Sequence, residues 1–153
     1  MSDSFLTLKE RLQADVKSAM KSGDKARLGT LRLAMAAIKQ REVDERVELD
    51  DAAVIAVLDK MLKQRRESIS QYEKGGRQDL AEIERAEIDV LQPFLPQPLS
   101  EAELTSLIED ALNRTAANAI GDMGKVMAIL KPALQGRADL AAVSKTVRTR
   151  LGA

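Results

Sequence analysis

The chain has 153 residues, with 24 basic and 24 acidic side chains, and it contains neither cysteine nor histidine. These absences exclude disulfides, a thiolate nucleophile, cysteine-ligated zinc and the commonest general base at neutral pH. No apolar run is long enough to cross a bilayer, and the N-terminus lacks the basic and apolar segments of a secretory signal. We therefore expect a cytoplasmic protein without membrane association.

The charge is unevenly distributed along the chain. Residues 77–110 hold two basic and nine acidic side chains, whereas residues 113–153 hold seven basic and two acidic ones. A basic segment of this kind is either a solvated surface or the binding site of a polyanion. The three aromatic residues, Phe5, Tyr72 and Phe94, are too few for a platform that stacks RNA bases. Any RNA binding would therefore depend on phosphate contacts and shape.

Apolar residues recur at helical spacing along the N-terminal part, and strand-like alternation is absent, which predicts an all-α fold. The first helix is expected at about 4–21, with Phe5 on its apolar stripe. The second begins at Asp24, a favourable N-cap. The third begins at Asp50 or Asp51 and ends at the Gly75-Gly76 pair, and the fourth covers about 78–92.

Three prolines between residues 93 and 98 cannot lie inside a helix. We predict a stiff connector at 93–99 between an N-terminal four-helix domain at 1–92 and a small three-helix tail domain at 100–153. Ser100 and Glu103 have the spacing of a capping box that opens the first tail helix. The next two helices are expected to begin near Asp122 and Asp139.

An arginine and a glutamate interrupt the apolar faces of the third and fourth helices. Arg65 lies eleven residues before Gly76 and Glu87 eleven residues after it. In an antiparallel hairpin the two side chains then lie opposite each other. We therefore predict an Arg65–Glu87 salt bridge in the N-terminal core, with Glu42 as a candidate third member. The alternative is that the side chains extend to the rim of the core.

The stretch "GDMGKVMAIL", which starts at Gly121, superficially resembles a phosphate-binding loop. Its glycine spacing is wrong, no strand precedes it, and Val126 replaces the hydroxyl residue that would bind magnesium. The stretch fits a helix start better, with Asp122 capping the N–H groups of Gly124 or Lys125.

No catalytic constellation emerges from the sequence, and neither a cofactor nor a metal is predicted. The last two helices and the turn between them offer basic groups with few carboxylates, which is typical of a surface for a phosphate backbone. The candidate RNA-binding residues are Lys125, Lys131, Arg137, Lys145, Arg148 and Arg150.

Several motifs resemble those of the GatB/YqeY family, specifically its stand-alone YqeY-like members, and the resemblance covers nearly the whole chain. The most specific are Gln64-Arg65-Arg66-Glu67-Ser68, Tyr72-Glu73-Lys74, Leu95-Pro96 and Asp122-Met123-Gly124-Lys125. The Gly136-Arg137-Ala138 turn is similar to one in the tail of the B subunit of the tRNA-dependent amidotransferase.

The resemblance implies an N-terminal helical domain and a C-terminal three-helix tail, which in the amidotransferase helps to hold misacylated tRNA. It also links the family to glutamine-dependent carbon–nitrogen ligase activity, although the catalytic parts of that enzyme have no counterpart in these motifs. Three functions follow as hypotheses. The chain is a tRNA-interacting accessory protein that is not catalytic alone, a subunit or relative of such a ligase, or a protein-interaction module without RNA. The expected partners are tRNA or a protein that acts in translation.

Overall fold

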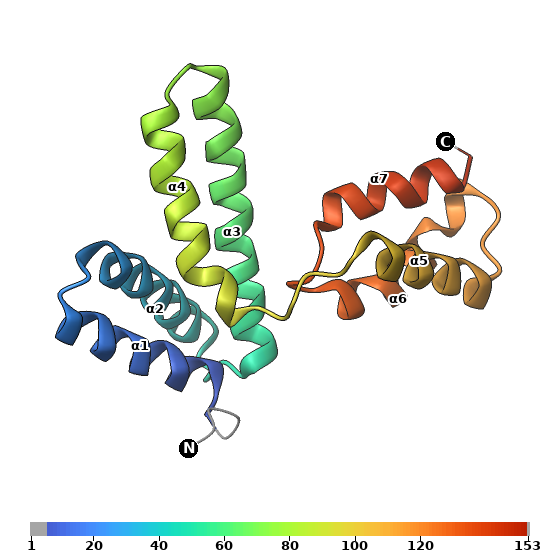
Figure 1. Cartoon of the computed structure of the whole chain (residues 1–153). Coiled ribbons are helices and arrows are strands. Elements are labelled where there is room, and N and C mark those ends of the chain that lie inside the picture. Colours follow the sequence, from blue (N-terminus) through green and yellow to red (C-terminus); the bar gives the residue numbers. More distant parts are fainter. Residues whose placement is uncertain (1–5, 153) are drawn as a thin grey trace. The chain divides into compact units, whose positions relative to one another are not determined.

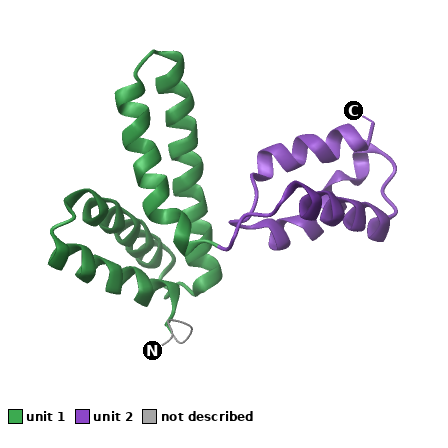
Figure 2. Ribbon diagram, viewed as in Figure 1, with its two compact units in different colours: residues 1–95 green, residues 96–153 purple. Residues whose placement is uncertain are grey.

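The computed structural model describes residues 6–152, and within this range every regular element is a helix (Figure 1). The predicted all-α class is therefore confirmed. The chain forms two compact units, Met1–Leu95 and Pro96–Ala153, called unit 1 and unit 2 below (Figure 2). The boundary falls inside the connector expected at 93–99; that 1–92 and 100–153 are separate domains stays a prediction.

The described part of unit 1 contains four α-helices, and a 3-10 turn follows the last of them. Their bounds are α1 Leu8–Ser22, α2 Lys25–Glu45, α3 Asp51–Lys74, α4 Gln78–Leu91 and η2 Gln92–Phe94. The predicted caps Asp24 and Asp50 are confirmed, because their carboxylates accept hydrogen bonds from the N–H groups of Arg27 and Ala53.

The first helix begins later than predicted. The hydroxyl of Thr7 accepts a hydrogen bond from the N–H of Glu10 at 3.1 Å, which is the geometry of an N-cap, so α1 starts at Leu8. The expected start at Ser4 and the apolar position Phe5 lie outside the described residues.

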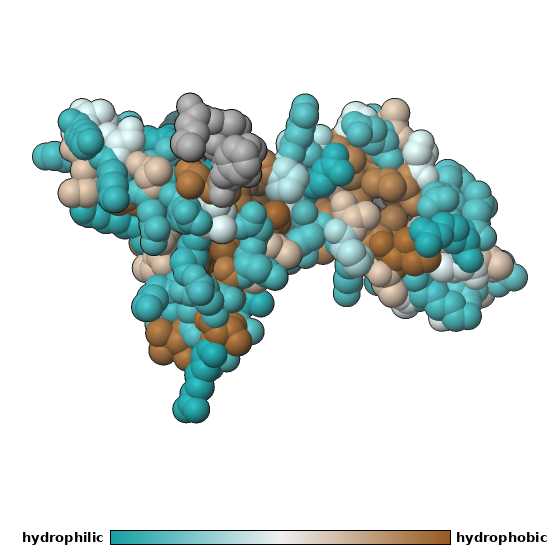
Figure 3. All heavy atoms as spheres, turned by 90° about the horizontal axis from the view of Figure 1, so that it is seen from below, coloured by the Kyte–Doolittle hydropathy of each residue, from teal (hydrophilic) through white to brown (hydrophobic). Residues whose placement is uncertain are grey.

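The core of unit 1 forms where the α1–α2 pair packs against the base of the long α3–α4 hairpin (Figure 1). Its largest fully buried side chains come from all four helices: Leu12, Leu31, Ile38, Val54, Leu58, Leu62 and Leu91. Burying these side chains is the main favourable contribution to the stability of unit 1. The face drawn in Figure 3 is largely hydrophilic, with apolar residues gathered in separate patches.

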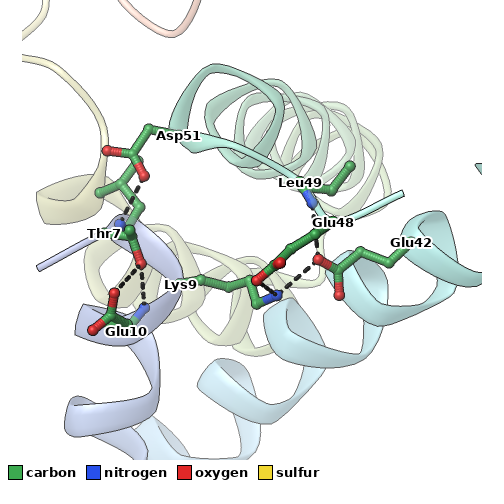
Figure 4. A network of polar contacts seen from close by, with 8 residues as sticks. Thr7, Lys9, Glu10, Glu42, Glu48, Leu49 and Asp51 are labelled. Atoms are coloured by element: carbon green, nitrogen blue, oxygen red, sulfur yellow. Dashed lines mark hydrogen bonds and ion pairs between the residues drawn. The ribbon is translucent and has the colours of Figure 1, made fainter. Parts of the chain in front are cut away.

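Polar contacts join the start of α1 to the end of α2, the following loop and the first residue of α3 (Figure 4). The N–H of Leu8 donates to Oδ1 of Asp51 at 3.0 Å, and Lys9 Nζ lies 2.7 Å from Oε2 of Glu42. The same glutamate oxygen accepts a hydrogen bond from the N–H of Leu49 at 2.9 Å. The expectation that Glu42 joins the Arg65–Glu87 pair is therefore wrong, because Glu42 lies in the last turn of α2, beside the start of α1.

The predicted Arg65–Glu87 salt bridge is confirmed, although the pair lies at the edge of the hydrophobic core and not inside it. Arg65 Nε lies 2.8 Å from Oε2 of Glu87, and the two side chains are 14% and 23% exposed. A further guanidinium N–H of Arg65 donates to the carbonyl of Met61 at 3.3 Å. Glu84 lies close by, and burial together with the charge of Glu87 raises its pKa above the ordinary value.

The described part of unit 2 is built from three α-helices and one 3-10 turn: α5 Glu101–Thr115, η3 Ile120–Asp122, α6 Met123–Leu134 and α7 Leu140–Arg150. The predicted capping box of Ser100 and Glu103 is present at the start of α5. The unit has a hydrophobic core of its own, to which all three α-helices contribute: Ile108, Ala111, Val126, Leu130, Leu134, Val143 and Val147.

We expect Arg65→Met to lower the free energy of unfolding by about 1–3 kcal/mol, because it leaves the half-buried Glu87 carboxylate without its partner. The double variant Arg65→Met/Glu87→Leu should recover part of this loss, since no unpaired charge remains. Urea denaturation measures both effects. Identical midpoints for the single and double variants would show that the two side chains are not coupled.

A second prediction concerns acid stability. The hydrogen bonds from Lys9 and from the Leu49 N–H hold the pKa of Glu42 below its ordinary value of 4.5. A carboxyl group whose pKa is lowered on folding stabilises the protein above the unfolded pKa, and this contribution is lost as the pH falls through the folded pKa. Glu42→Gln should therefore lower the Tm at neutral pH, and the difference from the parent protein should vanish in acid.

The control for this prediction is Glu48→Gln. Glu48 lies 3.6 Å from Lys9, and its side chain is 86% exposed. The same change of charge at this position should alter the Tm far less, because exposed ion pairs contribute little. Equal effects at the two positions would contradict a special role for Glu42.

Candidate nucleic-acid interface

The opening of α6 differs from its prediction in one detail. Oδ2 of Asp122 accepts hydrogen bonds from the N–H groups of Asn118 at 3.1 Å and Ala119 at 3.3 Å, and these bonds lower its pKa. It makes no side-chain cap to α6, so the expected bond to Gly124 or Lys125 is wrong. Asp122 is the last residue of η3, and its carboxylate points back to close the preceding loop.

Two of the six candidate cations have acidic partners inside unit 2. Arg150, at the end of α7, forms an ion pair with Glu109 of α5, and this pair lowers the pKa of Glu109. Lys125 Nζ lies 3.8 Å from a carboxylate oxygen of Asp122, in an exposed position. A phosphate would have to compete with these carboxylates for the two cations.

Arg137 is held by the connector. Its Nε donates to the carbonyl of Gln97 at 3.1 Å, and its own carbonyl accepts a hydrogen bond from the N–H of Leu99 at 3.1 Å. The preceding Gly136 is buried and has a φ of 75°, a left-handed conformation that favours glycine. Arg137 therefore joins the α6–α7 turn to the segment that leads into α5.

The other three candidates, Lys131, Lys145 and Arg148, are exposed, and none makes an ion pair or hydrogen bond through its side chain within residues 6–152. The charges of these three residues have no counter-charge among the described residues of unit 2. We call them the α6–α7 cation surface.

A polar contact between α6 and α7 shows where the α6–α7 cation surface lies on the two helices. The hydroxyl of Ser144 lies 3.9 Å from the sulfur of Met127, which marks where α7 meets α6. Lys131 lies one helical turn after Met127, and Arg148 one turn after Ser144, so both flank this junction. Lys145 lies about 200° around α7 from the buried Val143 and faces outward. This spread suits several phosphates of one backbone better than a single anion.

Two further features, a cluster of metal ligands and a membrane-spanning helix, are absent from the described residues. They contain no group of three or more aspartate, glutamate, histidine or cysteine residues placed to hold a metal ion. None of the helices in this part of the chain is long and apolar enough to span a membrane.

The sequence patterns did not reveal the partners of Arg137 and Arg150. Both depend on chain segments that are far apart in sequence, Gln97 being forty residues before Arg137. The acidic residues of α5 indicate that a partner for Arg150 is available there. Helical phase within one helix does not show which face of α5 packs against α7, so the pairing with Glu109 could not be predicted.

The chain belongs to the YqeY-like protein family, whose model matches residues 9–151. It is 34% identical over 152 residues to "Altered inheritance of mitochondria protein 41, mitochondrial" of Pyrenophora tritici-repentis, covering 94% of this chain and 80% of the relative. The protein of the same name from Lachancea thermotolerans is 35% identical over 114 residues, 72% of this chain and 61% of that relative. The match thus spans about three fifths of the Lachancea protein.

These relatives correct the expected location. Their names call them mitochondrial, as does that of a further relative from Eremothecium gossypii at 36% identity over 102 residues. The prediction of a cytoplasmic protein, which rested on composition and the absence of a secretory signal, is contradicted by this comparison.

We expect Arg137→Met to lower the free energy of unfolding of unit 2 by about 1 kcal/mol, because the Gln97 carbonyl loses its donor. The N–H of Leu99 should exchange faster with deuterium as the connector loosens. Arg148→Met is the matched control, since Arg148 has no partner within residues 6–152, and it should change neither quantity. Unaltered exchange at Leu99 in Arg137→Met would contradict the role of Arg137 as a tether.

Proposed function

We propose that this protein is a tRNA-interacting accessory protein that does not catalyse a reaction by itself. The observation that supports this most directly is the α6–α7 cation surface, Lys131, Lys145 and Arg148, whose charges have no counter-charge among the described residues of unit 2. Uncompensated cations spread over adjoining helices favour the regularly spaced charges of a nucleic-acid backbone.

Family membership supports the same proposal. Membership of the YqeY-like family relates the chain to the tail region of the amidotransferase B subunit, and the motifs that carry the resemblance include the start of α6 and the Gly136-Arg137-Ala138 turn. In this proposal Arg137 serves mainly to position the turn. Lys125 and Arg150 contribute less than the α6–α7 cation surface, because a phosphate must first compete with Asp122 or Glu109.

The test is the salt dependence of tRNA binding. Removing one cation that binds a phosphate should reduce the slope of log affinity against log salt concentration by about one. The triple variant Lys131→Gln/Lys145→Gln/Arg148→Gln should therefore bind tRNA more weakly at low salt, with a slope smaller by about three. The loss should be similar for tRNAs of different sequence, because phosphate contacts carry no base information.

The matched control is Lys17→Gln/Lys21→Gln/Lys63→Gln, which removes three exposed cations from unit 1. It should leave the slope nearly unchanged. If the parent protein fails to bind aminoacylated and deacylated tRNA at low salt, the proposal is wrong. It is also wrong if the control loses as much affinity as the α6–α7 variant.

A further inference from the structure

Helix α2 has apolar residues on two opposite faces, and unit 1 covers only one of them. Leu31, Ala34 and Ile38 point into the core and are almost completely buried. At 100° per residue, Leu33 and Val43 lie on the other side of the helix. These two side chains are 50% and 59% exposed.

The uncovered face has the spacing of a coiled-coil seam. Intervals of four, three, four and three residues separate its members, which are Gly29, Leu33, Ala36, Gln40 and Val43. This alternation keeps one line of side chains facing a second helix. A Cβ placed on Gly29 would meet no atom within 4 Å, so the surface there is open to a partner. We call this line the outer α2 seam.

One flank of the outer α2 seam is basic. Lys25, Arg32 and Lys39 project on the same side of it, and none of them makes an ion pair within the described residues. On the other flank the charged residue is Asp44, and its carboxylate already accepts a hydrogen bond from Gln40. The seam therefore presents an apolar line with positive charge along one side.

A hollow of about 450 Å³ lies at the C-terminal end of the seam. Val43 and Val47, which is 51% exposed, contribute apolar surface, and Lys39 and Arg46 contribute positive charge. Lys9, Glu42 and Glu48 also line the hollow, and both carboxylates lie beside Lys9 (Figure 4). The three cations of the hollow outnumber its two carboxylates, so it offers a place for an apolar side chain beside a carboxylate of a partner.

We propose that the outer α2 seam docks an acidic amphipathic helix of a partner protein. The apolar side chains of that helix pack on Leu33, Val43 and Val47, and its carboxylates face Arg32, Lys39 and Arg46. Gln40, in the middle of the seam, sets the register, as a single polar residue does in coiled coils.

A second copy of this chain fits the seam less well. In an antiparallel pair of α2 helices the same flank of each helix meets its counterpart, which places Arg32 and Lys39 among like charges. In a parallel pair the basic flank meets the opposite flank, where Asp44 is already engaged by Gln40. An acidic partner avoids both difficulties.

The probe is a synthetic amphipathic helix of about three heptads, with leucine at the seam positions and glutamate on the flanks. We expect it to bind the full-length protein and to shift the amide NMR signals of Leu33, Gln40 and Val43. A peptide with the same leucine pattern but lysine flanks should bind at least tenfold more weakly.

Two variants separate the contributions. Leu33→Ser/Val43→Ser removes apolar surface, and its control is Met20→Ser/Ile83→Ser, at positions that are 55% and 57% exposed. Arg32→Gln/Lys39→Gln removes charge, and its control is Lys17→Gln/Lys21→Gln. Each seam variant should lose at least tenfold in affinity for the glutamate peptide, and each control less than twofold, with unchanged helical circular dichroism.

Five outcomes would overturn the proposal. Three concern the peptides: the parent protein does not bind the glutamate peptide, it binds the two peptides equally, or the shifted NMR signals lie outside α2 and its hollow. The fourth is a dimer that Leu33→Ser/Val43→Ser converts to a monomer, and the fifth is a loss of tRNA binding in Arg32→Gln/Lys39→Gln, which would assign the flank to RNA. None of the peptide measurements involves RNA, so they stand or fall independently of the proposed tRNA role.

Discussion

The antiparallel pairing of α3 with α4 is the constraint on which unit 1 depends. Its base supplies Val54, Leu58, Leu62 and Leu91 to the core, against which the α1–α2 pair packs. The Arg65–Glu87 pair lies just beyond this apolar part, half-buried, at the level where the two helices come opposite one another. A register shift of either helix would separate these charges, so the ion pair and the apolar contacts favour the same alignment.

Unit 2 distributes its charges differently. Some of its basic residues are engaged within the fold, since Arg150 pairs with Glu109 and Arg137 binds the connector. Those of the α6–α7 cation surface have no counter-charge among the described residues. The difference matters because a neutralised cation gives little net energy to a phosphate contact, whereas an uncompensated one releases counterions when it binds. The formal charge of unit 2 therefore overstates the number of cations that are free to bind a polyanion.

Helical phase predicts an interaction well where that interaction lies within one helix or across a short hairpin. It places Arg65 opposite Glu87 because a two-glycine turn leaves one register, and capping patterns locate Asp24, Asp50 and Ser100 because capping depends on neighbouring residues. The same reasoning was wrong for Glu42 and Asp122. Both carboxylates accept hydrogen bonds from backbone N–H groups whose position the loops determine.

The helical class, most helix starts and the basic character of the last forty residues follow from the amino-acid sequence alone, because periodicity, capping and composition are local properties. Which cations remain uncompensated, and that the second apolar face of α2 stays uncovered within unit 1, became clear only from the packed helices. Both depend on which helices meet, and the periodicity of a single helix contains no information about its neighbours. The candidate RNA surface and the outer α2 seam are therefore products of packing.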